Sequence, residues 1–365
     1  MTAGKHRRYG RHVLRMERVY VRRRRVAALI LAMLAIMMGA GIGKGVTGVI
    51  GVVNNRNHVG TVRLAESGNT TSRSQERQSK QVEASGKAET KTTPISNAMG
   101  GINAVDGSAA IATTGFTLDD NSRAALDAQI ANFTNSGYTA SFVLTDLTTG
   151  RTLAYNADTP IYSASAIKAP FIMSLAATGT IDLGKVYQAA DEQSAEIKQN
   201  IDSTLTVSDN TAYKWLVDTF DVNAFNTWSE QAGASARMTT GHGYVTTSAR
   251  DMARLWTQGY GFLFQHMNSG ATDVTDESLQ WLSGDMTDSL NSNIHNALGG
   301  TQTVYTKAGW ISGDGDLYAL NDGGLVASPS GPYVLTVLTN ACDRNDLLTS
   351  LIGTLDSVHS SAMHS

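Results

Sequence analysis

The chain has 365 residues, of which 41% are hydrophobic, 17% charged and 7% aromatic, and its formal net charge is −3. This composition is that of a globular protein long enough to build one large core or two modest ones. Its single cysteine excludes an intramolecular disulfide framework and any metal site that needs several thiolates, such as a zinc ribbon or an iron–sulfur cluster.

The N-terminus separates basic charge from a long apolar run. Residues 1–25 hold ten Lys and Arg side chains against one Glu, and residues 26–43 are an uncharged stretch of 18 residues that can span a bilayer core. The charge bias predicts that the N-terminus stays in the cytoplasm. We expect a cytoplasmic tail at 1–25, a single-pass transmembrane anchor at 26–43 and an extracytoplasmic remainder. A cleaved signal peptide is the alternative, although no clear A-x-A site follows the apolar run.

Other uses of these N-terminal segments are weaker interpretations. A basic block can bind nucleic acid, but the apolar run beside it argues for a membrane rather than a nucleic-acid partner. Residues 44–115 are rich in Ser, Thr, Gly, Gln, Asn and Lys, and no Phe, Trp or Tyr occurs between Tyr20 and Phe116. Such a segment cannot bury enough apolar surface to offset the entropy of ordering it. We expect a flexible low-complexity tether at 44–115 and one folded domain at 116–358.

Within that domain the patterns of hydrophobicity alternate between helix and strand. Residues 119–134 have helical spacing, residues 139–145 and 152–155 form a predicted hairpin, and a block of helices extends from about 165 to 260. Further strands are predicted at 303–311, 316–321, 324–327 and 333–339, before a closing helix at about 346–358. Because the two ends supply the strands and the middle supplies helices, we expect an α/β sandwich with a separate all-helical subdomain.

Ser165 and Lys168 are the first candidate catalytic pair. The run IYSASAIKAP changes from a strand-like entry to a helix, so Ser165 lies in the first turn and Lys168 one turn later on the same face. Free N–H groups at a helix N-terminus can stabilise an oxyanion. An amine with a lowered pKa can take the serine proton. Taken alone, the pair reads better as a capping serine followed by a solvated lysine.

Two later motifs favour the catalytic interpretation. The tripeptide SDN begins at Ser208, and the tripeptide KAG begins at Lys307 at the end of a strand-like run. The order SxxK, SDN and K-x-G resembles the class A β-lactamases and penicillin-binding proteins. Further segments that look like class A sequence, in the family's order, lie at 153–158, 162–170, 208–212 and 246–255. The resemblance covers roughly 116–358 and implies an antiparallel sheet flanked by helices, with an all-helical subdomain.

The resemblance also implies roles in acylation. Ser165 would be the nucleophile that attacks a lactam or peptide carbonyl, and Lys168, kept neutral by nearby Lys307, would be the base. Ser208 would pass a proton to the departing nitrogen. Lysines on an exposed helix and an exposed strand are the alternative for these positions.

Substrate binding is implied by a second group of residues. Asn210 would hold the acylamide of the substrate and Lys307 would pair with its carboxylate. Gly309 would let the edge strand approach the ligand, and the N–H groups of Trp310 and Ser165 would form the oxyanion hole. Ala308 stands where the family usually has a hydroxyl residue, which removes one contact to the carboxylate.

The sequence departs from the family where hydrolysis of the acyl-enzyme is concerned. The stretch between Asn210 and Thr246 is short and contains no E-x-x-L-N, so the deacylation glutamate is missing. Glu230 is the one acidic side chain near the right distance, but its surroundings read as a helix. His242 could activate water instead, although an ordinary loop histidine is the better interpretation.

Two further residues stand beside the motifs. Arg250 is the nearest substitute by position for an auxiliary carboxylate-binding arginine, since no Lys or Arg occurs from 308 to 343; an exposed helix-surface arginine is the alternative. Cys342, with no partner histidine motif, is read as a structural cysteine.

The sequence thus predicts a membrane-anchored extracytoplasmic serine hydrolase that is acylated on Ser165. Its substrates would be small molecules, either β-lactams or D-Ala-D-Ala-like cell-wall peptides. No cofactor, metal or nucleic acid is expected, and the oligomeric state is left open. A true β-lactamase with relocated water activation is one alternative. A non-catalytic pseudoenzyme that binds the cell wall or a partner protein is the other.

Overall fold

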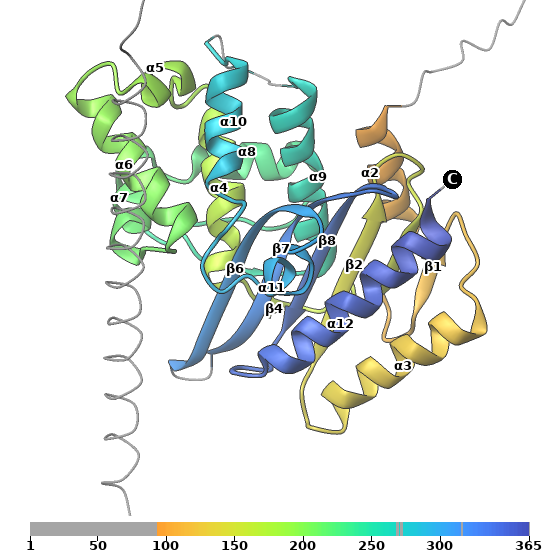
Figure 1. Ribbon diagram of the computed structural model, residues 1–365. Helices are drawn as coiled ribbons and strands as arrows, with labels where there is room; N and C mark the ends of the chain where they lie inside the picture. Colours follow the sequence, from red (N-terminus) through yellow and green to blue (C-terminus); the bar gives the residue numbers. More distant parts are fainter. Residues whose placement is uncertain (1–92, 268–269, 271–272, 315–316, 365) are drawn as a thin grey trace, which may run out of the picture. The chain divides into compact units, whose positions relative to one another are not determined.

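The computed structural model describes residues 93–364, except 268–269, 271–272 and 315–316 (Figure 1). The expected tail at 1–25, the expected anchor at 26–43 and most of the expected tether lie outside these residues. Within the described part, no helix has the length and apolar character needed to cross a membrane.

A six-stranded sheet is the centre of the described part. Its strands are β1 (Ala112–Thr114), β2 (Ala140–Asp146), β3 (Thr152–Tyr155), β6 (Thr303–Asp314), β7 (Leu317–Ser328) and β8 (Gly331–Thr339). All recorded pairings are antiparallel, and the order is β1-β3-β2-β8-β7-β6, so β6 is an edge strand. A separate two-stranded ribbon joins β4 (Ile161–Tyr162) to β5 (Thr246–Thr247).

Helices cover both faces of the sheet (Figure 1). One face carries α3 (Asp120–Thr134), α11 (Asn293–Leu298) and α12 (Asn345–Val358), which is followed by the short η2 (His359–Met363). Apolar residues of α3 and α12, such as Phe133 and Leu351, are fully buried against it. The other face carries α2 (Pro94–Ala104) and α9 (Ala249–Gln265). The expected sheet flanked by helices is confirmed.

The all-helical subdomain is also confirmed. It consists of α4 (Lys168–Ala177), α5 (Leu183–Gln188), α6 (Glu192–Thr206), α7 (Asn210–Phe220), α8 (Asn223–Gln231) and α10 (Asp276–Gly284). Every residue of α4 is buried, because this helix lies against α6, α8 and α9 in the middle of the larger apolar core.

The folded part begins earlier than residue 116. Helix α2 and strand β1 both lie in the stretch that was expected to be tether, and α2 buries Ala98 and Ile102 completely. A capping box formed by Thr93 and Ser96 starts the helix, with a proline in its first turn. The predicted start of the folded domain at residue 116 is wrong. The prediction took the lack of aromatic residues before Phe116 as a sign of a flexible segment, whereas α2 folds by burying a few small or aliphatic side chains completely.

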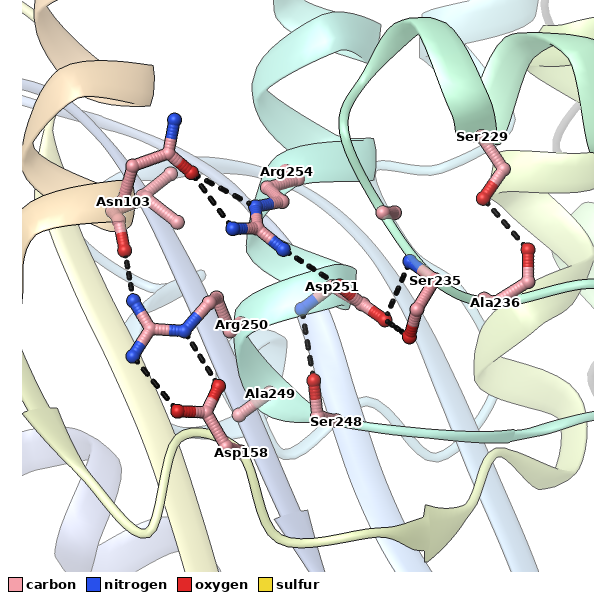
Figure 2. A network of polar contacts seen from close by, with 12 residues as sticks. Asn103, Asp158, Ser229, Ser235, Ala236, Ser248, Ala249, Arg250, Asp251 and Arg254 are labelled. Atoms are coloured by element: carbon pink, nitrogen blue, oxygen red, sulfur yellow. Dashed lines mark hydrogen bonds and ion pairs between the residues drawn. The ribbon is translucent and has the colours of Figure 1, made fainter. Parts of the chain in front are cut away.

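Arg250 anchors α2 to the rest of the fold (Figure 2). Its guanidinium donates hydrogen bonds to the carbonyls of Ile102 and Val105 and to both carboxylate oxygens of Asp158, at 2.6 and 3.0 Å. Arg254 adds two bonds to the Asn103 side chain. Arg250 is therefore neither an exposed surface arginine nor available to a substrate carboxylate: it is buried, and its guanidinium is occupied by the end of α2 and by Asp158.

Strand β7 is continuous where two strands, at 316–321 and 324–327, were expected. The register runs without a break through Asp322, which pairs with Ala308 of β6 and Val337 of β8. Asp322 is accommodated inside the sheet because Ser292 and the backbone of Ile294 donate hydrogen bonds to its carboxyl group. Asp322, which lies between the two expected strands, is therefore a buried and hydrogen-bonded residue within one strand and does not mark a turn.

Candidate active site

Ser165 lies on the 3-10 helix η1 (Ala164–Ile167), immediately before α4. The residue before it, Ala164, has φ of 43°, a left-handed conformation that costs an L-residue about 1 kcal/mol or more. Ser165 is half-buried, and its hydroxyl has no hydrogen-bond partner among the described residues. The strained backbone at Ala164 turns the chain sharply into η1, and the Ser165 hydroxyl is left free to attack a substrate.

Strand β6 lies against η1 at Gly309. A Cβ atom at this position would lie 2.3 Å from the nitrogen of Ala166 and 2.7 Å from the nitrogen of Ser165. Since both neighbours are backbone atoms, no side chain can be accommodated without moving β6 away from the nucleophile. The glycine of the KAG motif therefore sets the distance between the strand and the serine.

Backbone N–H groups converge at this contact. The N–H of Thr306 donates to the carbonyl of Met286, outside the sheet, at 2.8 Å. Because N–H groups alternate in direction along a strand, those of Ala308 and Trp310 point to the same free edge of β6. The N–H of Ser165 belongs to the first turn of η1, where no intrahelical acceptor exists. The backbone thus offers the donors that an oxyanion between Ser165 and Trp310 needs.

Lys168 is completely buried at the start of α4. Its Nζ lies 2.6 Å from Oδ1 of Asn210 and 2.8 Å from the carbonyl oxygen of Ser208. It also lies 3.4 Å from Oγ of Ser208. The SxxK and SDN motifs, separated by 40 residues of helix and turn, are therefore joined directly through this amine.

Burial lowers the pKa of Lys168 to about 8, while the carboxylate of Asp209 acts in the opposite direction. The lowered pKa agrees with a lysine that can act as a base. Its cause differs from the one implied by the family resemblance, since the enclosing apolar core and not the charge of Lys307 is the main source.

Lys307 is also completely buried. Its Nζ donates to the carbonyl of Ala308 at 3.0 Å and lies 6.0 Å from the centre of the Trp310 ring. Burial and, second, the charge of Lys168 lower the pKa of Lys307 to about 7, whereas Asp322 raises it. The positive charge of Lys168 therefore makes a second positive charge on Lys307 less favourable.

The SDN segment connects α6 to α7. Ser208 adopts a left-handed φ of 58°, and Asp209 caps α7 by accepting hydrogen bonds from Thr211 and Ala212 at 2.7 and 3.0 Å. Asp209 is thus a capping residue, which fixes Asn210 as the first residue of the helix. Asn210 is exposed, and its Nδ2 has no partner among the described residues.

The side chain of Ala308 contributes no polar atom to the site. It is buried opposite Asp322 in the sheet. The side chain of Trp310, by contrast, is 37% exposed beside Lys307. The structure therefore offers an aromatic surface and one buried ammonium group, and no side-chain hydroxyl at position 308, for a substrate carboxylate.

Two residues that the sequence analysis missed support the site from β7. The carboxyl group of Asp322 is buried below Lys307, and burial raises its pKa to about 6. The side-chain amide of Asn321 donates to the carbonyls of Tyr162 and Ser163, at 2.8 and 3.1 Å, and so holds the segment that precedes the nucleophile. The signal available in the sequence was a pair of polar residues inside an otherwise apolar strand.

Tyr244 is the third residue that was missed. It lies in the connecting loop, residues 232–248 between α8 and α9, and its hydroxyl donates to Oδ1 of Asn210 at 3.1 Å. No motif marks this tyrosine, because its contact with Asn210 spans 34 residues and depends on the path of the loop.

Two candidate water activators make no recorded hydrogen bond to these residues in the part of the chain that the structure describes. Glu230 is exposed on α8, and His242 is exposed in a turn closed by its own backbone bond to Thr239. Within the described ranges, neither side chain hydrogen-bonds to Ser165, Lys168, Ser208 or Asn210. Cys342 lies elsewhere, with its thiol directed at the carbonyls of Ile311 and Ala319.

The gathered groups suit one kind of chemistry. Among residues 93–364 as far as they are described, no three His, Cys, Asp or Glu side chains come together as metal ligands. What the site contains is an unpaired serine hydroxyl, a buried amine with a lowered pKa, a second hydroxyl beside that amine and backbone donors for an oxyanion. These are the components of acyl transfer through a serine ester.

Comparisons with known proteins agree with this geometry. The sequence model of the beta-lactamase enzyme family matches residues 124–357. The fold is similar to that of a β-lactamase from Sphaerobacter thermophilus, with a TM-score of 0.50 and 16% identity over 65% of this chain and 97% of that chain. It is also similar to PBP-A, solved as a point mutant in an acyl-enzyme complex with penicillin G, with a TM-score of 0.51 and 19% identity over 64% of this chain and 96% of that chain. A search of the curated proteins finds no match. The family prediction made from the three motifs is confirmed, and the chain belongs to the β-lactamase enzyme family.

Proposed function

We propose that this protein is a serine hydrolase that forms an acyl-enzyme on Ser165 with β-lactams or with D-Ala-D-Ala-like cell-wall peptides. The observation that carries the proposal is the position of Lys168. Its buried amine lies one turn after Ser165 and is held by both ends of the SDN motif, at 2.6 Å from Asn210 and 2.8 Å from Ser208. A buried lysine without a chemical task is costly to the fold.

Acylation follows from these positions. Oγ of Ser165 attacks the carbonyl carbon and its proton passes to the neutral amine of Lys168. The oxyanion is held by the N–H groups of Ser165 and Trp310. When the tetrahedral intermediate collapses, the carbon–nitrogen bond breaks and the nitrogen takes a proton, delivered from Lys168 through the hydroxyl of Ser208. The products are an ester on Ser165 and a free amine, which stays attached when the substrate is a lactam.

Hydrolysis of that ester is the slow step in this proposal. Water needs a general base to attack an ester rapidly, and the connecting loop at 232–248 contains no Asp or Glu. The tyrosine that this loop brings to the site, Tyr244, has its pKa raised to about 12 by burial, so it stays protonated at neutral pH. The acyl-enzyme is therefore long-lived, which favours penicillin binding or peptidase chemistry over efficient destruction of antibiotics.

We place the protein at the cytoplasmic membrane as a single-pass protein, with the catalytic part on the cell-wall side. The sequence supports this: the uncharged stretch at 26–43 follows ten basic residues. In intact cells, an external protease should then remove the catalytic domain and leave an epitope at residue 1 protected. Protection of the catalytic domain would contradict the placement.

The activity is tested on the full-length protein with a fluorescent penicillin. We expect covalent labelling of the wild type at close to one label per chain, and no labelling of Ser165→Ala. Ser136→Ala, which removes an exposed serine at the end of α3, is the matched control and should label like wild type. Equal labelling of wild type and Ser165→Ala would overturn the proposal.

Turnover of nitrocefin distinguishes slow from rapid deacylation. We expect a burst of about one product per chain followed by a slow steady rate. Rapid multiple turnover that falls on changing His242 or Glu230 would instead establish a true β-lactamase. Peptidase activity is measured separately, as D-alanine released from a peptide that ends in D-Ala-D-Ala.

A further inference from the structure

The connecting loop is fixed around Tyr244 on both sides. On one side, the hydroxyl of Tyr213 donates to the carbonyl of Gly243, and a Cβ atom at Gly243 would lie 2.9 Å from that hydroxyl. On the other side, the carbonyl of Val245 accepts from the N–H of Ser163 at 2.8 Å. The loop is thus tied both to α7 and to the segment that leads into the nucleophile.

The ring of Tyr244 is held as firmly as its backbone. It packs edge-on against Tyr213, with ring centres 5.3 Å apart, and lies 6.2 Å from the ring of Tyr162. Such aromatic pairs limit the movement of the ring. The hydroxyl therefore reaches Asn210 from a defined direction and not as a freely rotating side chain.

Two donors meet at one atom of Asn210. Oδ1 accepts a hydrogen bond from the Tyr244 hydroxyl at 3.1 Å and another from the Lys168 amine at 2.6 Å. An amide oxygen has two lone pairs, so both of its acceptor positions are filled. The amide NH2 group is then the only part of this side chain that is left for a ligand, and it has no partner among the described residues.

We propose that Tyr244 is a positioning residue, which locks the Asn210 amide with its oxygen inward and its NH2 group outward and so selects substrates that carry an acylamide carbonyl. This inference rests on the proposed function and adds to it a preference for one class of substrate. Lys168 can donate to Oδ1 of Asn210 only while its amine is not exchanging a proton with Ser165 or Ser208. Tyr244 takes no part in that exchange, so its hydrogen bond keeps the Asn210 amide in the same orientation throughout the reaction. The phenol suits this task because it stays a donor at neutral pH.

The test compares two lactams on the full-length protein. Benzylpenicillin carries an acylamide, whereas 6-aminopenicillanic acid has a free amine at that position. Tyr244→Phe removes one oxygen and keeps the ring. We expect it to slow acylation by benzylpenicillin about 3- to 10-fold, the effect of one neutral hydrogen bond, and acylation by 6-aminopenicillanic acid less than about 2-fold.

Two further variants show whether the tyrosine acts through Asn210. In Asn210→Ala, adding Tyr244→Phe should cause no further loss, because the amide that it orients is gone. Tyr260→Phe is the matched control: its hydroxyl bonds to Gln265 at the far end of α9, and the variant should behave as wild type. Equal effects of Tyr244→Phe on both lactams, or independent effects of the two substitutions, would overturn the proposal.

An NMR measurement that does not depend on acylation tests this inference separately from the proposed function. The side-chain amide protons of Asn210, assigned by NMR from their loss in Asn210→Ala, should shift in Tyr244→Phe and not in Tyr260→Phe. An unchanged Asn210 signal would overturn the role of Tyr244 even in an enzyme that is acylated. A shifted signal in a protein that no lactam acylates would support the orientation and reject the proposed function.

Discussion

The rate of acylation should depend on pH in both directions. The reaction requires Lys168 as a neutral base and Lys307 as a cation that attracts the substrate carboxylate. Raising the pH increases the fraction of Lys168, with its pKa lowered to about 8, that is a neutral base. It also decreases the fraction of Lys307, with its pKa lowered to about 7, that is a cation. The first effect dominates below the maximum and the second above it. The profile of the second-order rate constant is therefore bell-shaped.

The size of the effect follows from the two pKa values. Because the pKa of the base lies above that of the cation, only about one molecule in twenty has the required combination at the maximum, near pH 7.5. The rate should fall about 6-fold at pH 6 and by a similar factor at pH 9. The assay is stopped-flow acylation by a fluorescent penicillin at substrate concentrations far below saturation.

Asp322→Asn assigns the falling limb. The Asp322 carboxylate raises the pKa of Lys307, so its removal should lower the rate constant at pH values above the maximum and leave the rate constant well below the maximum unchanged. Asp218→Asn, in an exposed ion pair with Lys214, is the control and should move neither limb. A rate constant that does not change between pH 6 and pH 9, or an Asp322→Asn variant that lowers the rate constant only below the maximum, would refute the reasoning.

Three other variants test separate parts of the account. Gly309→Ala should abolish penicillin labelling, since its Cβ would overlap the backbone of η1; labelling within about 3-fold of wild type would contradict this close approach. Ser208→Ala should slow acylation about 100-fold while the rising pH limb stays in place, because the backbone carbonyl that holds Lys168 remains; an unchanged rate would remove Ser208 from the proton path. Arg250→Ala leaves the carbonyls of Ile102 and Val105 and the carboxylate of Asp158 without this donor and should lower the free energy of unfolding by about 2–4 kcal/mol in urea denaturation, against about 1 kcal/mol or less for Lys214→Ala, which removes an exposed ion pair with Asp218. Equal losses would refute the anchoring role of Arg250.

The sequence predicts the sheet, the helical subdomain and the family because these depend on local patterns and on the order of short motifs. Gly309 was expected to let the edge strand approach a ligand; its close packing against the backbone of η1 was not predicted and is seen only in the structure. The start of the fold was missed at α2. Its capping box and its proline are visible in the sequence, but its anchor is Arg250, which lies 148 residues away from Ile102.

The residues missed at the site are those whose role depends entirely on tertiary contacts. Tyr244 reaches Asn210 only because the connecting loop is tied to Tyr213 and Ser163. Asp322 affects Lys307 only because β7 pairs with β6 in one particular register. The contact of Tyr244 leaves no pattern or motif in a single sequence, whereas Asp322 leaves only the weak signal of a polar residue within an apolar strand, which does not identify its partner.

The central claim is that Ser165 is the residue acylated. The most direct measurement is mass spectrometry of peptides from the full-length protein after incubation with benzylpenicillin. We predict an increase equal to the whole mass of the antibiotic, since ring opening releases no atoms, on the peptide that contains Ser165. An unmodified Ser165 peptide, or the same increase on another residue, would contradict the account.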